Sequence, residues 1–226
     1  MELAIRVLLA YLLGSVNGAL LVGRLVGGVD IRTQGSGNAG GTNALRTQGP
    51  AFALAVIVID IAKGWLAAAW LGTASLPGGL GSGAGRAETL LGWAPAACGF
   101  AAILGHVYPV FHGFRGGKGV ATVVGAIAGL VPAMLGVVLG TWFVMMLLFG
   151  FVGFASIVAT AALPLALALR AAPLDDGSTP LVAFGIACAL LVSWTHRGNL
   201  RRMRAGTEPR ARRLWLLGRL RGGKGA

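Results

Sequence analysis

Long apolar runs limit what this chain can fold into more than any other feature of its sequence. The runs 3–26, 50–73, 89–112 and 180–196 are each apolar enough to cross a membrane, although the last is short, because a spanning helix needs about 20 mostly apolar residues. Only 12% of the 226 residues are charged, whereas about a quarter are charged in an average soluble domain. The sequence therefore predicts an all-α, polytopic integral membrane protein.

The apolar stretch 119–170 is too long for a single crossing. As one helix it would extend about 78 Å, against a hydrocarbon core of roughly 30 Å. It must therefore fold back on itself, and it contains either two spans or three. Three short spans fit breaks near Pro132 and near Gly150 or Gly153, where proline and glycine would end a helix.

The distribution of Lys and Arg decides between these two numbers, because cytoplasmic loops collect basic residues. The segments 28–49 and 113–118 and the tail after His196 are basic, which predicts that they lie in the cytoplasm. The loops 74–88 and 171–179 are neutral or acidic and suit the outer side. An odd number of crossings must then separate 113–118 from 171–179. The prediction is about seven transmembrane helices, with the N-terminus outside and the C-terminus in the cytoplasm.

The net charge of +12 arises mainly near the C-terminus, because ten of the nineteen basic residues follow Ser193. A basic tail directly after an apolar run indicates a cytoplasmic, membrane-proximal segment rather than a nucleic-acid-binding one. We predict one transmembrane domain over 1–208 and a basic cytoplasmic tail over 209–226. Cys98 and Cys188 lie alone in apolar runs, so neither a disulfide nor a metal site is predicted.

The first polar motif is "GSGNAGGTNALR", residues 35–46. Its Gly-x-Gly-x-x-Gly spacing matches a dinucleotide-binding fingerprint, which also needs a preceding strand and an acidic residue at a later strand end. No strand pattern is visible, and Asp60, twenty residues after Gly40, lies within an apolar run. The motif is instead suited to bind an anion through backbone N–H groups, with a flexible polar loop as the alternative. Its polar side chains are Ser36, Asn38, Thr42, Asn43 and Arg46.

The second motif is "GHVYPVFHGFRGGKGVAT", residues 105–122. Its Gly-x-x-x-Gly-Lys-Gly is one residue shorter than a P-loop and has glycine where a P-loop has the Ser or Thr that holds magnesium. Lys118 at the start of a helix still suits a phosphate, because bare backbone donors, a helix N-terminus and a point charge coincide there. His106 lies in an apolar run without a visible acidic partner, so we interpret it as structural. His112 is interpreted as a polar residue of the membrane interface.

The third motif is "HRGNLRRMRAGTE", residues 196–208, where the last apolar run ends. A stop signal for membrane insertion accounts for its arginines. Such a signal does not need His196, Asn199 and Glu208, which are therefore candidate site residues.

Asp60 and Lys63 are two charged residues within the second apolar run. They are three positions apart, so they can pair on one helix. A charge within the membrane costs at least about 2.5 to 3.5 kcal/mol and by default marks a function. A functional site and a buried pair that tethers helices both stay open as interpretations.

These three motifs, with "DIAKG" between the first two, resemble the PlsY family of bacterial acyl-phosphate:glycerol-3-phosphate acyltransferases over nearly the whole chain. The chain departs locally at Gly41, where that family usually has alanine or another small residue. The resemblance implies transfer of a fatty acyl group from acyl phosphate to the sn-1 hydroxyl of glycerol 3-phosphate, giving lysophosphatidic acid and phosphate. It also implies a place in the bacterial cytoplasmic membrane, with the active site facing the cytoplasm.

The resemblance further implies roles for individual residues. Ser36, Arg46 and Lys118 would bind the phosphate of glycerol 3-phosphate. His196 and Asn199 would bind the acyl-phosphate head or the reacting hydroxyl, and together with Lys118 they are the predicted catalytic residues. The residues predicted to shape the pocket or to let the backbone approach the substrate are Asn38, Thr42, Asn43, Gly116, Gly117, Gly119 and Glu208. Because the family lacks a general base, a substrate phosphate oxygen would take the hydroxyl proton.

The implied partners are glycerol 3-phosphate, acyl phosphate, membrane lipids and the soluble enzyme that makes acyl phosphate, with no cofactor, metal or nucleic acid. The His-x4-Asp dyad of other glycerolipid acyltransferases is absent, because the fifth residue after each histidine is Phe111, Gly117 or Arg201. Two alternatives are a transporter or channel for a phosphorylated metabolite and a lipid-binding scaffold. A transporter would need polar residues along a continuous path, whereas polarity here is concentrated at one face.

Overall fold

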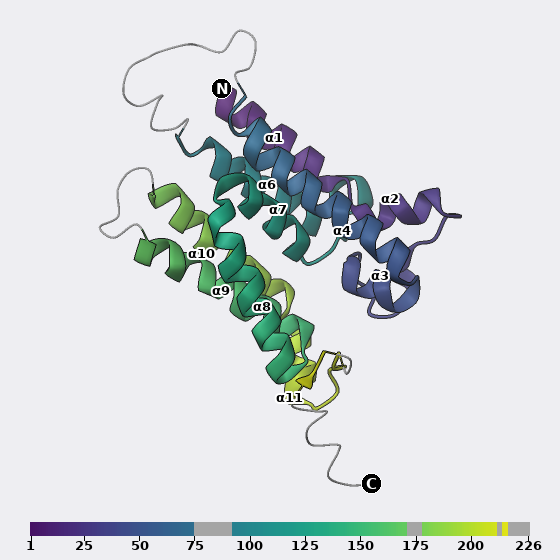
Figure 1. Ribbon diagram of the computed structural model, residues 1–226. Helices are drawn as coiled ribbons and strands as arrows, with labels where there is room; N and C mark the ends of the chain where they lie inside the picture. Colours follow the sequence, from purple (N-terminus) through teal and green to yellow (C-terminus); the bar gives the residue numbers. More distant parts are fainter. Residues whose placement is uncertain (75–91, 171–177, 212–213, 217–226) are drawn as a thin grey trace, which may run out of the picture. The chain divides into compact units, whose positions relative to one another are not determined.

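The computed structural model describes residues 1–74, 92–170, 178–211 and 214–216. These residues form helices joined by short loops (Figure 1), and every regular element among them is helical. The predicted all-α class is therefore confirmed. The chain divides into two compact units, Met1–Pro132 and Ala133–Ala226, and each is described by itself.

The first unit contains the first two motifs. It begins with α1 (Glu2–Ser15) and α2 (Gly18–Leu25), which meet at a bend of 47°. The 3-10 turn η1 (Ile31–Thr33), the short helix α3 (Gly41–Thr47) and the long helix α4 (Pro50–Trp65) follow, and α4 continues as a π-helical segment, η2 (Leu66–Leu71). The remaining elements are α6 (Ala94–Val107), the 3-10 turn η3 (Val110–His112) and α7 (Val120–Leu130).

Small residues allow the helices of the first unit to pack closely. α1 lies along α6, and α4 lies along α7. A Cβ atom on Gly14 would lie 2.1 Å from the carbonyl oxygen of Ala102, and one on Gly125 would lie 1.9 Å from that of Ile61. A larger residue at either place would push two helices apart. Close approach of backbones through small residues is the usual packing of helices in membranes.

The second unit contains the third motif. A 3-10 turn, η4 (Pro132–Met134), leads into its long helices α8 (Leu135–Phe149), α9 (Val152–Arg170) and α10 (Thr179–Thr195), and the short helix α11 (Arg197–Arg204) follows. α9 packs against both α8 and α10. The chain leaves α8 through Gly150, whose φ of +74° is the left-handed conformation that favours glycine.

Both predicted breaks in the long apolar stretch are confirmed. α7 ends two residues before Pro132, and α8 ends at Gly150. The first predicted span, 3–26, contains a further break that was not predicted, at Val16 and Asn17 between α1 and α2. No proline or left-handed glycine marks it, and its cause is the hydrogen bonding described below.

By length and composition, four to six of the described helices or helix pairs are able to cross a membrane. Four qualify alone, and the bent pairs α1–α2 and α10–α11 bring the number to six. α7 is apolar but has 11 residues, which extend about 16 Å at 1.5 Å per residue. The predicted number of about seven transmembrane helices and the orientation of the termini therefore stay predictions. The predicted outer loops 74–88 and 171–179 lie almost wholly outside the described residues.

The first residues of the predicted tail 209–226 contact the body of the second unit. The indole N–H of Trp215 donates to the carbonyl oxygen of Leu148 at 3.1 Å. The guanidinium of Arg210 lies 3.9 Å from the centre of the Trp215 ring, within the range of a cation–π contact. The chain is thus held where α8 ends, and the domain boundary at 208 stays a prediction.

The predicted orientation leads to a labelling pattern. In a protein without Cys98 and Cys188, single cysteines at positions 34, 114 and 205 should be shielded from a membrane-impermeant maleimide in intact cells. Cysteines at positions 80 and 177, which lie outside the described residues, should react. The reason is the excess of Lys and Arg near the first three positions. Labelling of position 205 from outside would contradict the odd number of spans.

Candidate active site

Asn43 organises the loop of the first motif. Its side chain is buried, and its Oδ1 accepts a hydrogen bond from the backbone N–H of Ser36 at 2.9 Å. Its Nδ2 donates to the carbonyl oxygens of Ile31 and Gln34 at 3.1 and 3.0 Å. Its amide therefore holds the loop in shape. Three residues of this motif that were predicted to bind the phosphate or to shape the pocket have exposed side chains, namely Ser36, Thr42 and Arg46.

The Gly-Gly-Lys-Gly turn of the second motif packs against the end of α6. The N–H groups of Gly116 and Gly117 donate to the carbonyl oxygens of Val107 and His106, both at 3.1 Å. A Cβ on Gly116 would lie 2.0 Å from the His106 oxygen, so the turn fits only without side chains here. These two N–H groups are thus used within the protein. The first N–H groups of α7, which begins two residues after Lys118, have no partner within their helix and are suited to a phosphate.

Arg32, three residues before the first motif, binds the backbone of the second motif. Its Nη1 donates to the carbonyl oxygens of His112 and Arg115 at 3.1 and 3.3 Å. Its Nη2 and Nε bind the carboxylate of Asp30 at 2.8 and 3.0 Å. The hydrogen bond from Arg32 lowers the pKa of Asp30 below its ordinary value of 3.8. Any stability from this pair is therefore present above that value and is lost as the pH falls through the lowered pKa.

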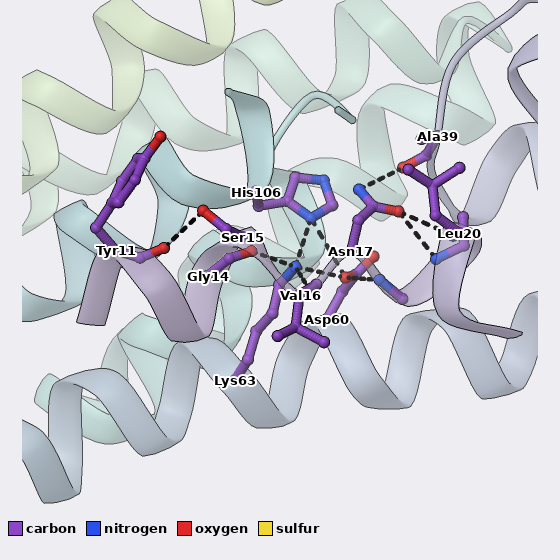
Figure 2. A network of polar contacts seen from close by, with 12 residues as sticks. Tyr11, Gly14, Ser15, Val16, Asn17, Leu20, Ala39, Asp60, Lys63 and His106 are labelled. Atoms are coloured by element: carbon purple, nitrogen blue, oxygen red, sulfur yellow. Dashed lines mark hydrogen bonds and ion pairs between the residues drawn. The ribbon is translucent and has the colours of Figure 1, made fainter. Parts of the chain in front are cut away.

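A network of buried polar groups lies where α1 ends and α2 begins (Figure 2). Lys63 Nζ is 2.9 Å from Asp60 Oδ1, so the two form the ion pair that their spacing on α4 predicted. Lys63 Nζ also donates to the carbonyl oxygens of Gly14 and Val16, each at 2.9 Å. Asp60 Oδ1 accepts a hydrogen bond from the N–H of Gly18 at 3.1 Å. Both charged groups therefore bind the helix break as well as each other.

His106 reaches the same network from α6 (Figure 2). Its Nδ1 lies 3.2 Å from Asp60 Oδ1 and 2.9 Å from Lys63 Nζ. The interpretation of His106 as a histidine without an acidic partner is therefore wrong. The partner lies on another helix, far away in the sequence, so local spacing could not reveal it.

Asn17 connects the helix break to the first motif. Its Oδ1 accepts from the N–H groups of Ala19 and Leu20 at 3.0 and 3.2 Å, which caps the start of α2. Its Nδ2 donates to the carbonyl oxygen of Ala39, within the first motif, at 3.3 Å. Asparagine is a preferred residue at the start of a helix. This preference is the one signal by which the sequence marks the break.

The third motif is built around a buried carboxylate in the second unit. Glu208 Oε1 accepts from Asn199 Nδ2 at 2.6 Å, and Glu208 Oε2 accepts from Arg202 Nε at 2.7 Å. His196, at the bend between α10 and α11, directs its Nδ1 to the carbonyl oxygen of Val192 at 2.8 Å. Because a carbonyl only accepts, Nδ1 carries a hydrogen. Arg202, predicted as part of a stop signal, thus also holds Glu208 in place.

Comparison with known proteins identifies the family. The family model for glycerol-3-phosphate acyltransferase matches residues 4–206. The chain belongs to this family. It is 42% identical over 201 residues to a glycerol-3-phosphate acyltransferase of Gloeobacter violaceus, covering 89% of this chain and 91% of that protein. It is 38% identical over 221 residues to one of Chlorobaculum tepidum, covering 90% and 94%.

Solved structures of the family agree with this membership. The crystal structure of PlsY, an integral membrane glycerol 3-phosphate acyltransferase, in its glycerol 3-phosphate form matches with a TM-score of 0.75 and 31% identity. The match covers 93% of this chain and 96% of that one. The lysophosphatidic acid form matches with the same TM-score and 30% identity, covering 93% and 95%.

The predicted site residues are divided between the two compact units of this protein. The first unit holds those of the first two motifs, and their loops touch, because a Cβ on Gly117 would lie 2.6 Å from the carbonyl oxygen of Ala39. The second unit holds those of the third motif. Among the described residues, no group of three His, Cys, Asp or Glu side chains is arranged to hold a metal ion. The side-chain contacts that were not predicted include those of Asn17, Arg32, His106 and Arg202.

Proposed function

We propose that this protein transfers a fatty acyl group from acyl phosphate to the sn-1 hydroxyl of glycerol 3-phosphate. The products are lysophosphatidic acid and phosphate, as in the first step of phospholipid synthesis. Membership of the glycerol-3-phosphate acyltransferase family supports the acceptor. The observation that carries the proposal is that two phosphate-suited loops, 35–46 and 116–119, pack against each other at Ala39 and Gly117.

The phosphate of glycerol 3-phosphate binds, in this proposal, to Ser36, Arg46 and Lys118. Ser36 is exposed on the loop before α3, Arg46 is exposed in the last turn of α3, and Lys118 lies two residues before α7. A guanidinium matches a phosphate with two parallel hydrogen bonds, while an ammonium acts as a point charge. The partial positive charge at the start of α7 adds to both. Gly119, the N-cap of α7 with φ of +87°, lets the backbone turn into that helix.

His196 and Asn199 engage the acyl-phosphate head or the reacting hydroxyl. The hydrogen on Nδ1 of His196 is directed to Val192, so the neutral ring carries its lone pair on Nε2. Asn199 is held through its amide nitrogen by Glu208. Both side chains are thus fixed by contacts within the second unit, and fixed groups stabilise developing charge without reorganising.

The reaction needs one bond to form and one to break. The acceptor oxygen attacks the acyl carbonyl carbon, and the bond from this carbon to the phosphate oxygen breaks, with its electron pair leaving on phosphate. The hydroxyl proton passes to a phosphate oxygen of the substrates, so no side chain has to act as a general base. Acyl phosphate is a mixed anhydride with a good leaving group, and positioning and charge stabilisation supply the rate.

The same proposal covers the setting of the reaction. We infer a bacterial cytoplasmic membrane, with the motifs at its cytoplasmic side, since their loops carry the basic residues. Acyl phosphate would come from a soluble enzyme on that side. Membrane lipids would surround the fatty chain.

The donor is tested with purified full-length protein in detergent. We expect transfer to glycerol 3-phosphate from palmitoyl phosphate and none from palmitoyl-CoA, with equal rates in the presence and absence of EDTA. The reason is that the Gly-Gly-Lys-Gly turn has no hydroxyl for magnesium and that the leaving group needs no activation by a metal. Activity that requires acyl-CoA or magnesium would contradict the proposal.

A further inference from the structure

Charged side chains satisfy the helix ends at the break in the first unit. A helix ends with carbonyl groups that lack partners, and the next begins with N–H groups that lack them. Lys63 donates to the carbonyl oxygens of Gly14 and Val16 at the end of α1, and Asp60 accepts from Gly18 at the start of α2. A cation at a helix C-terminus and an anion at an N-terminus are what the helix dipole favours. The pair therefore fixes the geometry of the break.

The network is shared among three side chains rather than split into pairs. An ammonium group has three N–H bonds, yet four atoms lie 2.9 Å from Lys63 Nζ: Gly14 O, Val16 O, Asp60 Oδ1 and His106 Nδ1. The carbonyls take two hydrogens, so one is left for Asp60 and His106. When Nδ1 of His106 carries a hydrogen, it donates to Asp60 at 3.2 Å and Lys63 directs its third hydrogen to the same carboxylate oxygen, so every donor has an acceptor. Loss of one side chain therefore changes the contacts of the other two.

Two contacts extend this network to the phosphate-suited loops. Asn17, within the break, donates to the carbonyl oxygen of Ala39 in the first motif. His106 accepts from the N–H of Gly117 in the second motif, at 3.1 Å, through its backbone oxygen. A Cβ on Gly117 would lie 2.2 Å from His106 Nε2 and 2.6 Å from Ala39 O. The ring of His106, Gly117 and Ala39 are thus in direct contact.

We propose that Asp60, Lys63 and His106 are positioning residues for the acceptor phosphate. They hold the loop 35–46 and the turn at Lys118 at the separation that the phosphate of glycerol 3-phosphate requires. This inference rests on the proposed function. A role limited to holding the fold together would change stability alone. A positioning role changes the KM for glycerol 3-phosphate and leaves the KM for acyl phosphate unchanged.

The test compares His106→Gln with His106→Asn in purified full-length protein. The amide of Asn stands near the place of Nδ1, so it can keep the contacts with Asp60 and Lys63, whereas the amide of Gln stands near the place of Nε2. We expect His106→Gln to raise the KM for glycerol 3-phosphate about tenfold or more. The reason is that misplacing a substrate by 1 Å can lower the reaction rate on the order of 10²-fold, so a shift of the phosphate-binding loops should also weaken binding. His106→Asn should stay closer to the wild type.

Two further variants separate positioning from folding. Arg6 is buried on α1, the helix that ends at the break. Its guanidinium donates to the carbonyl oxygen of Gly72 at 3.0 Å and pairs with the carboxylate of Glu2. Arg6→Met should lower thermal stability without changing either KM.

Asn17→Ser keeps an N-cap for α2 but loses the donor to Ala39. It should raise the KM for glycerol 3-phosphate, and it keeps the proposal testable if His106→Gln does not fold.

The Kd for glycerol 3-phosphate, measured by calorimetry on the same variants, should follow the KM. The positioning role is overturned if His106→Gln and Asn17→Ser bind glycerol 3-phosphate as tightly as the wild type and, like Arg6→Met, lose only stability. Failure of the proposed function has a different signature, because the wild type would then transfer nothing from acyl phosphate. The calorimetric comparison would still decide the positioning role in that case.

Discussion

Lys118→Ala and Arg46→Ala should each lower kcat/KM for glycerol 3-phosphate by about 10²-fold or more. A hydrogen bond to a charged group contributes about 1.5 to 3 kcal/mol, and misplacement of the acceptor adds to its loss. The steady-state rate with saturating acyl phosphate and varied glycerol 3-phosphate measures this. Ser36→Ala should lose less, because a neutral hydroxyl contributes about 1 kcal/mol.

Arg115→Ala is the matched control for Lys118→Ala. Arg115 is an exposed cation in the same segment between α6 and α7, and its backbone oxygen, which accepts from Arg32, is kept in the variant. Its removal should change kcat/KM by no more than about twofold, since salt screens exposed charges. Equal losses in both variants would indicate a general effect of charge rather than a phosphate site. A Lys118→Ala protein with normal kinetics would refute the proposed mechanism.

Features that depend on a residue and its near neighbours were predictable from the sequence. Pro132 and Gly150 end helices through their own backbone restrictions, so the breaks at these places were predicted correctly. The pairing of Asp60 and Lys63 was predicted because residues three apart share one face of a helix. The apolar composition likewise predicted the all-α membrane class.

Features that depend on contacts between helices were not predictable. The break at Asn17 is stabilised by charged groups of α4, and His106 meets Asp60 only because α6 and α4 pack together. Arg32 entered the sequence analysis only as one of the basic residues of segment 28–49, whereas in the structure it binds two carbonyl oxygens of the second motif. Hydrogen bonds to backbone atoms carry no residue-specific pattern, so one sequence does not reveal them.

Removal of one charge from the buried pair should have the largest effect on stability. Asp60→Asn or Lys63→Met leaves the other charge buried without its partner, which costs about 3 to 5 kcal/mol. Both side chains are almost fully buried, with 1% and 3% exposure, so water cannot replace the lost partner. Thermal unfolding of the purified variants in detergent measures the loss.

The double variant distinguishes a simple pair from a pair that also binds the helix break. If the two charges served only each other, Asp60→Asn with Lys63→Met would restore most of the stability. Asn at position 60 can still accept from Gly18, but Met at position 63 leaves the carbonyl oxygens of Gly14 and Val16 without their donor. Each unsatisfied buried group costs about 1 to 3 kcal/mol. The double variant should therefore lose less stability than the sum of the losses in the two single variants. It should still be clearly less stable than the wild type. Stability equal to that of the wild type would show that the carbonyls do not need Lys63, and strictly additive losses would show that the two charges do not interact.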